Sequence, residues 1–145
     1  MADEESAIGT EPDGEIRCGY VALLGAPNVG KSTLLNRLVG AKVSIVTPKV
    51  QTTRNRVLGI AVTSGDQIVY VDTPGIFTPQ KRLDRAMVAA AWGGAADADV
   101  VVVLADAKRG LDADSGRIVA GLAKVGRPAL LALNKIDLVR RETLL

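Results

Sequence analysis

The sequence predicts an α/β fold with a mostly parallel sheet. Segments rich in β-branched residues alternate with segments whose apolar residues recur at helical spacing, and helices between strands are what a parallel sheet requires. Residues 100–105 form a continuous aliphatic run, as expected for a strand that is covered on both faces. The chain has 145 residues, of which 48% are hydrophobic, so it is long and apolar enough for about one domain with a buried core.

The first strand and the first helix are expected on either side of a glycine-rich loop. Residues 17–24 are β-prone and end at Gly25. Residues 31–39 are expected to form a helix that ends at Gly40, because glycine is typical of helix C-terminal caps. The apolar residues on one face of this helix are Leu34, Leu35, Leu38 and Val39. A polar and basic stretch, residues 41–56, follows the helix.

Two further strands are expected to pair as a hairpin, and a second helix follows them. Residues 57–63 and 67–72 are β-prone and flank Ser64-Gly65-Asp66, a sequence typical of a tight turn. Residues 83–92 have a helix-forming composition, and we expect this helix to end at the glycine pair Gly93-Gly94.

The remainder of the chain is expected to add a third helix after the aliphatic strand, and then a second buried strand. The helix is predicted at residues 112–125 and is closed by Gly126. Its apolar face consists of Ile118, Val119, Leu122 and Val125. The acidic residues expected to cap it and to charge its first turn are Asp112 and Asp114. The second buried strand is predicted at residues 128–133, and a final helix is expected to begin near Arg140.

The composition excludes several kinds of catalysis. The chain has no histidine and a single cysteine, so it has no Ser-His-Asp or Cys-His groups, no internal disulfide and no Cys-based metal cage. Catalysis must therefore use lysine, aspartate, hydroxyl groups, backbone amides or a bound metal ion. Cys18 is expected to be buried in its strand and Trp92 to be partly buried. No aliphatic run approaches the ~20 residues that cross a bilayer, and the acidic N-terminus is unlike a secretory signal.

Charge is distributed unevenly along the chain. The formal net charge is +2, yet residues 1–16 carry six acidic side chains and no basic one. We interpret residues 1–16 as a flexible acidic leader and residues 17–145 as the folded domain. The positive charge of the domain favours an anionic ligand or nucleic acid. Two basic clusters, which we interpret as solvated faces in preference to RNA-binding sites, consist of Lys42, Lys49, Arg54 and Arg56 and of Lys81, Arg82 and Arg85.

The loop between the first strand and the first helix has the pattern G-x-x-x-x-G-K-S, which is typical of phosphate binding. Its residues are Gly25, Ala26, Pro27, Asn28, Val29, Gly30, Lys31 and Ser32, and Thr33 follows them. Glycines let backbone N–H groups turn inward around a diphosphate, and the helix N-terminus adds partial positive charge. Lys31 is expected to reach the β- and γ-phosphates, and Ser32 to ligate Mg²⁺. The alternative, an ordinary glycine turn, is disfavoured by the strand–loop–helix context.

A second motif ends the third expected strand and consists of Asp72, Thr73, Pro74 and Gly75. A carboxylate at a strand tip near a phosphate-binding loop can hold Mg²⁺, usually through water. The backbone amide of Gly75 can face a γ-phosphate, because no side chain blocks it. Alone, this tetrapeptide is an ordinary turn, but its position about 40 residues after the first motif favours a functional role.

A third motif follows the last expected strand and consists of Asn134, Lys135, Ile136 and Asp137. Guanine presents two adjacent donors, its N1–H and its amino group, whereas N1 of adenine is an acceptor. A carboxylate therefore suits guanine and repels adenine, and we assign this role to Asp137. Asn134 is expected to bond the base edge and to tie its loop to the first motif, and the Lys135 stem to cover the base. The alternative is that these polar residues merely terminate a strand.

These three motifs are the G1, G3 and G4 motifs of P-loop GTPases. The first motif, extended to residues 25–36, resembles that of the Era family of bacterial ribosome-assembly GTPases. Further segments that resemble this family are residues 40–46, 51–54 and 59–60. Sister families that modify tRNA or assemble the large subunit typically carry an aspartate where Asn55 stands. The resemblance covers residues 17–140 and implies a P-loop, three-layer α/β/α G domain.

The resemblance implies hydrolysis of GTP to GDP and phosphate with Mg²⁺. It implies that Lys31, Thr53 and Gly75 are catalytic, and that all residues of the three motifs, with Thr33 and Ile76, line the nucleotide site. Thr53 is expected to close over the ion when the γ-phosphate is present, and Thr52 is the alternative for this role.

The resemblance also implies two kinds of metal ion. The expected Mg²⁺ ligands are Ser32, Thr53 and Asp72, and Asn28 is expected to help bind K⁺. Ile76 stands where Ras-like enzymes place a water-orienting glutamine. An aliphatic side chain cannot orient water, so we expect slow intrinsic hydrolysis that K⁺ or a partner accelerates.

Compared with the family, the chain is expected to be incomplete after residue 145. A complete G domain adds one strand, the G5 loop and a last helix, and Era-like proteins continue into a KH domain that binds the 3′ end of small-subunit rRNA. Without these parts, the strand at residues 128–133 is expected at an uncovered sheet edge. The resemblance implies small-subunit rRNA and the 30S subunit as partners, through that KH domain. It further implies a monomer in the cytoplasm that associates peripherally with the inner membrane.

Two other functions remain as alternatives. The first is a nucleotide-dependent binding module with negligible hydrolysis, which Ile76 favours, whereas Thr53 and Asp72 favour an enzyme. The second is an ATP-using P-loop protein, which Asn134 and Asp137 argue against.

Overall fold

The computed structural model of the chain describes residues 15–46 and 55–144. In this part of the chain, the strands form a single five-stranded sheet with the order β2-β3-β1-β4-β5. The strands are β1 (Cys18–Gly25), β2 (Val57–Thr63), β3 (Asp66–Asp72), β4 (Val100–Asp106) and β5 (Leu130–Asn134). Among these five strands, only the β2–β3 pair is antiparallel, so the predicted mostly parallel α/β fold is confirmed.

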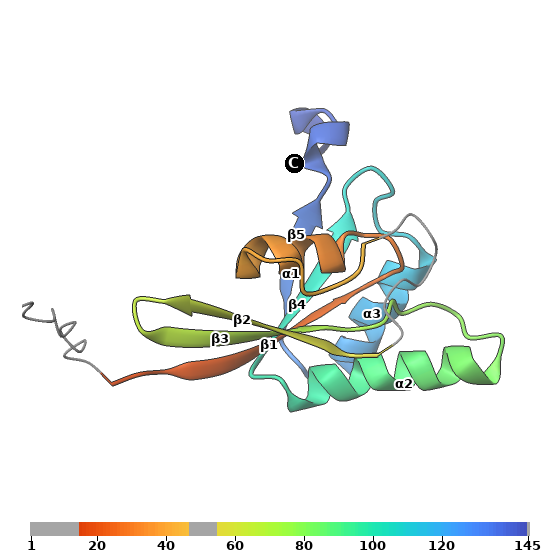
Figure 1. Ribbon diagram of the computed structural model, residues 1–145. Helices are drawn as coiled ribbons and strands as arrows, with labels where there is room; N and C mark the ends of the chain where they lie inside the picture. Colours follow the sequence, from red (N-terminus) through yellow and green to blue (C-terminus); the bar gives the residue numbers. More distant parts are fainter. Residues whose placement is uncertain (1–14, 47–54, 145) are drawn as a thin grey trace, which may run out of the picture.

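Helices cover both faces of this sheet (Figure 1). The helices are α1 (Lys31–Val39), α2 (Arg82–Asp97), α3 (Ala113–Lys124) and two short 3₁₀ helices, η1 (Ile136–Leu138) and η2 (Arg141–Leu144). α1 packs on one face, and α2 and α3 pack on the other. This is the predicted three-layer α/β/α arrangement. In the described part of the chain, no helix has both the length and the apolar character that crossing a membrane requires.

The sheet divides the core into two apolar layers. Along β1, Leu23 faces α1 whereas Leu24 faces α2 and α3, because successive residues of a strand point to opposite faces. The layer under α1 consists of Leu23, Ala26, Val29, Leu35 and Leu104. The opposite layer consists of Leu24, Ile76, Ala91, Ala95, Val101, Val103, Ile118 and Leu122. Burial on both faces fixes the register of the central strands and so holds their carboxyl ends at one edge.

The second helix is longer than predicted, and its glycine pair does not end it. α2 continues through Gly93 and Gly94 to Asp97. A Cβ atom on Gly94 would lie 3.0 Å from Cγ2 of Thr73 and 3.4 Å from Cδ of Arg56. The absence of a side chain therefore lets α2 approach the end of β3 closely. The glycines serve packing here, and not helix termination.

Burial differs from the predictions in several elements. β5 is an edge strand of the described sheet, and Leu130, Leu131 and Leu133 are 63%, 61% and 45% exposed. The predicted buried strand is therefore wrong, whereas the expected uncovered edge is confirmed. Cys18 is exposed and not packed, because only the last four residues of β1 are buried. The apolar residues of the predicted helix faces that are exposed in the structure are Leu38, Val119 and Val125.

Other expectations hold. Trp92 is partly buried, as expected. Its indole ring packs against Gly121 of α3, where an added Cβ atom would lie 2.6 Å from the ring. Asp112 caps α3 by accepting a hydrogen bond from the backbone N–H of Ser115 at 2.8 Å. The expected last helix is the 3₁₀ helix η2. Most of the expected leader, residues 1–14, lies outside the described residues.

Candidate nucleotide-binding site

The three sequence motifs meet at one edge of the sheet. β1 pairs in parallel with β3 and with β4, and β4 pairs in parallel with β5, so the carboxyl ends of these strands lie together. The first motif follows β1, the second follows β3, and the third begins at the end of β5. Ligands of open parallel sheets bind at this edge. The topology therefore places the predicted phosphate, metal and base residues around one site.

The backbone of the first motif requires its glycines. Gly30 has φ +102° and forms the N-cap of α1, in a conformation that glycine adopts readily. A Cβ atom on Gly25 would lie 2.8 Å from the carbonyl oxygen of Leu104 and 2.7 Å from Cγ2 of Val29. The loop is thus closed tightly between β1 and α1, and it leads directly to the helix N-terminus, where backbone N–H groups can bind an anion.

Lys31 is buried within the first motif. Its Nζ donates to the carbonyl oxygens of Gly25 at 3.1 Å and Ala26 at 2.9 Å. Burial lowers the pKa of Lys31 from its usual value to about 8, against the opposing effect of the Asp72 carboxylate. The ammonium group therefore remains mostly protonated at pH 7, and it lies where the predicted phosphate-binding loop turns.

Two of the three expected Mg²⁺ ligands, Ser32 and Asp72, are hydrogen-bonded to each other. The Ser32 hydroxyl donates to Oδ2 of Asp72 at 2.5 Å, and the Asp72 side chain is fully buried. In the described residues, no cluster of three or more His, Cys, Asp or Glu side chains could hold a metal ion alone. One hydroxyl with one carboxylate fits Mg²⁺, which prefers oxygen ligands and commonly takes the remainder from phosphates and water. Thr53 and its alternative Thr52 lie outside the described residues.

The second motif contacts the first at close range. A Cβ atom on Gly75 would lie 2.9 Å from three atoms of Pro27, so only glycine fits here without displacement of the loop. The Thr73 hydroxyl donates to the carbonyl oxygen of Leu23 at 2.7 Å. Ile76 was expected to line the nucleotide site, but its side chain lies in the core layer under α2 and α3. Its backbone N–H donates to the Gly25 carbonyl at 3.0 Å, which links the two motifs.

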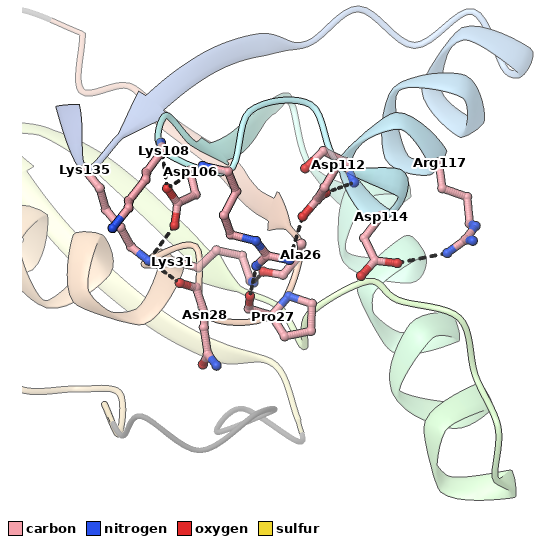
Figure 2. A network of polar contacts seen from close by, with 12 residues as sticks. Ala26, Pro27, Asn28, Lys31, Asp106, Lys108, Asp112, Asp114, Arg117 and Lys135 are labelled. Atoms are coloured by element: carbon pink, nitrogen blue, oxygen red, sulfur yellow. Dashed lines mark hydrogen bonds and ion pairs between the residues drawn. The ribbon is translucent and has the colours of Figure 1, made fainter. Parts of the chain in front are cut away.

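The third motif is anchored to the first as predicted. Nδ2 of Asn134 donates to the carbonyl oxygen of Val29 at 2.8 Å. Nζ of Lys135 donates to the carbonyl oxygen of Asn28 at 2.8 Å (Figure 2). Lys135 has φ +57°, a left-handed conformation that turns the chain into η1, where Asp137 is exposed. The third motif is thereby held at a fixed place relative to the first motif.

Asp106, at the end of β4, was not predicted to belong to the site. Its Oδ2 accepts from Nζ of Lys135 at 2.8 Å, and its Oδ1 accepts from the backbone N–H groups of Lys108 at 2.9 Å and Arg109 at 3.3 Å (Figure 2). Burial acts to raise the pKa of Asp106, but these hydrogen bonds and the Lys135 charge outweigh it and lower the pKa. Asp106 therefore positions Lys135. The available signal was a carboxylate at the end of an aliphatic strand, the same placement as Asp72.

The fold, the glycine-rich loop with its buried lysine, and the anchored N-K-x-D motif define a P-loop GTPase. A family model described as "50S ribosome-binding GTPase" matches residues 20–135. The chain belongs to this family and, within it, to the Era GTPases.

Several relatives and solved structures are similar to the chain. GTPase Era of Rhizobium meliloti (strain 1021) is 58% identical over 142 residues, which are 98% of this chain and 44% of the relative. GTPase Era of Afipia carboxidovorans is 64% identical over 129 residues, which are 89% of this chain and 42% of the relative. The chain thus spans less than half the length of these curated relatives.

Two solved Era structures share the fold. Era in complex with MgGDPNP and nucleotides 1506–1542 of 16S ribosomal RNA has a TM-score of 0.80 and 43% identity, and the match covers 85% of this chain and 42% of that one. A single-residue variant of Aquifex aeolicus Era bound to GDP·AlF₄⁻ has a TM-score of 0.83 and 41% identity, with 90% and 45% covered.

Proposed function

We propose that the chain binds GTP with Mg²⁺ and hydrolyses it to GDP and phosphate. The proposal rests on one observation, which is that three groups lie together around residues 25–32. These groups are buried Lys31, the hydrogen-bonded Ser32 and Asp72, and the third motif, which is anchored to the first. The similar Era structures, one with MgGDPNP and one with GDP·AlF₄⁻, support both the nucleotide and the reaction.

In the proposed reaction, water attacks the γ-phosphate in line with the departing GDP. Lys31 stabilises the charge on the phosphoryl oxygens, and the backbone N–H of Gly75 donates to the γ-phosphate. Bound Mg²⁺, held by Ser32, Asp72 and Thr53, neutralises phosphate charge. Because Ile76 is buried in the core, the chain supplies no side chain at that position to orient the attacking water.

The base preference is tested by titrating the chain with GDP and with ADP in the presence of Mg²⁺. We expect GDP to bind and ADP to show no measurable affinity, because N1 of adenine is an acceptor that Asp137 repels. Isothermal calorimetry measures both titrations directly. Tight ADP binding would contradict the guanine assignment, and a chain that binds neither nucleotide would contradict the proposed function.

Hydrolysis is expected to be slow and to depend on K⁺. We propose that Asn28 helps to hold this ion near the phosphates. The Asn28 side-chain amide points away from Lys135 (Figure 2). Lys135 Nζ instead donates a hydrogen bond to the backbone oxygen of Asn28. Single-turnover phosphate release should be faster in KCl than in NaCl at equal ionic strength, by about 10-fold if positioned charge is lost with the ion. Equal rates exclude the K⁺ proposal. No phosphate release over hours in either salt favours the alternative, a binding module with negligible hydrolysis.

We further propose that the protein acts in small-subunit assembly, as a cytoplasmic monomer with peripheral membrane association. The Era structure solved with 16S rRNA nucleotides supports the RNA part of this proposal. The resemblance to the Era family supports the remainder, and no residue of the described site recognises RNA by itself.

A further inference from the structure

Ser44, on the segment that follows α1, makes a buried contact with the metal-binding carboxylate. The Ser44 hydroxyl donates to Oδ2 of Asp72 at 2.8 Å. The same oxygen accepts from the Ser32 hydroxyl at 2.5 Å. Ser44 is only 3% exposed, although the residues on either side of it are exposed. The side chain is therefore turned inward at one point of an otherwise exposed segment, toward the proposed Mg²⁺ site.

Asn36 holds Ser44 in this place. Oδ1 of Asn36 accepts from the backbone N–H groups of Val43 at 2.9 Å and Ser44 at 2.8 Å. Nδ2 of Asn36 donates to the carbonyl oxygen of Ser44 at 2.9 Å. Asn36 lies on α1, one turn beyond the proposed Mg²⁺ ligand Ser32. The same helix therefore also holds Ser44, which contacts the second proposed ligand, Asp72. The geometry is thus set by a rigid element.

We propose that Ser44 is a positioning residue of the Mg²⁺ site, which orients the Asp72 carboxylate toward the ion. This inference rests on the proposed function. Two hydroxyl groups on one carboxylate oxygen restrict the rotation of that carboxylate, and so present it to the ion in one orientation. Hydrogen bonds of this kind to metal-binding groups are typically worth about 10- to 100-fold in metal affinity.

A purely structural role for Ser44 makes a different prediction. If the hydroxyl only satisfies a buried polar contact, its removal loosens the segment after α1 and affects nucleotide binding whether or not Mg²⁺ is present. If the hydroxyl positions Asp72, its removal weakens Mg²⁺ binding and changes GDP release only when Mg²⁺ is present. The dependence of GDP release on Mg²⁺ concentration separates the two roles.

The experiment measures the release of fluorescent mant-GDP from the full 145-residue chain, from excess EDTA to millimolar Mg²⁺. For Ser44→Ala, we expect the Mg²⁺ concentration that half-maximally slows release to rise about 10-fold. The release rate in EDTA should equal that of the unmodified chain. Ser44→Thr keeps the hydroxyl and should restore the original midpoint. Ser115→Ala, which removes another buried serine hydroxyl in the first turn of α3, should leave the midpoint unchanged.

Ser44→Cys replaces the hydroxyl with a slightly larger thiol that donates a hydrogen bond only weakly, so it tests the same contact if the alanine variant does not fold. The inference is overturned if Ser44→Ala, or Ser44→Cys in its place, slows GDP release half-maximally at the same Mg²⁺ concentration as the unmodified chain. Faster release by the same factor at every Mg²⁺ concentration, including EDTA, overturns it as well. If the unmodified chain binds GDP and responds to Mg²⁺ while the midpoint of Ser44→Ala is unchanged, only this inference fails. If the unmodified chain does not bind GDP, the proposed function fails with it.

Discussion

Replacing Lys31 with methionine is expected to lower the affinity for GDP by about 100-fold, since a buried charged donor to phosphate is lost. Hydrolysis of bound GTP should fall by about a further 10²- to 10³-fold, because the charge that develops on the phosphoryl oxygens loses its nearest cation. Lys31 lies inside the loop, and its Nζ donates to the Gly25 and Ala26 carbonyls. Calorimetry and single-turnover phosphate release measure the two effects.

The same substitution should stabilise the nucleotide-free chain. Burial lowers the pKa of Lys31 to about 8 from 10.5, so the folded state disfavours the protonated form by on the order of 3 kcal/mol. This destabilisation is fully present below pH 8, where the lysine is protonated in both states, and it disappears as the pH rises toward 10.5. Urea unfolding should therefore show Lys31→Met to be more stable than the unmodified chain at pH 7, with the difference reduced at pH 10.

The control for both measurements is Lys124→Met, which removes an exposed lysine at the end of α3. It should change neither GDP affinity nor the pH dependence of unfolding. If Lys31→Met bound GDP as tightly as the unmodified chain, the loop would not be the phosphate site. If it lost GDP binding and also stability at pH 7, the buried ammonium would not be a source of destabilisation.

Local patterns predicted the elements whose boundaries depend on local signals. α1 and β2 have the predicted bounds, because a helix that starts after Gly30 and ends before Gly40 is set by backbone conformations that glycine allows. Asp112 was predicted as a cap for a similar reason, since capping joins residues three apart. The three motifs lie at one edge of the sheet because each follows a strand of its parallel part.

Features that depend on distant contacts could not be predicted. Gly94 resembled a helix stop, and only its closeness to Thr73 shows that it is a packing residue. The contact of Ser44 with Asp72 joins residues 28 apart in the sequence, and that of Asp106 with Lys135 joins residues 29 apart. A polar residue in an exposed segment, or at the end of a strand, has the same local signature whether or not it reaches the site.

Replacing Asp137 with asparagine is expected to change which base the chain binds. The Asp137 carboxylate offers two acceptors to the two donors of guanine, whereas an asparagine amide offers one acceptor and one donor. The donor would face the guanine amino group, so GDP affinity should fall by about 10²- to 10³-fold. Xanthine carries a carbonyl oxygen in place of that amino group, so xanthosine diphosphate should gain affinity. Direct calorimetric titration of the variant and of the unmodified chain with each nucleotide measures the change.

The Asp137→Asn substitution should change base recognition alone, because the loop that carries Asp137 is anchored by other residues. Asn134 and Lys135 hold this loop to the Val29 and Asn28 carbonyls, and Asp137 itself is exposed, so the substitution leaves those contacts in place. Glu142→Gln removes the acidic side chain of η2 and should leave both affinities unchanged. Equal losses for GDP and xanthosine diphosphate would mean that Asp137 shapes the loop without contacting the base. A loss of affinity for GDP together with a gain for xanthosine diphosphate would show that the Asp137 side chain, on a preformed loop, determines base selection.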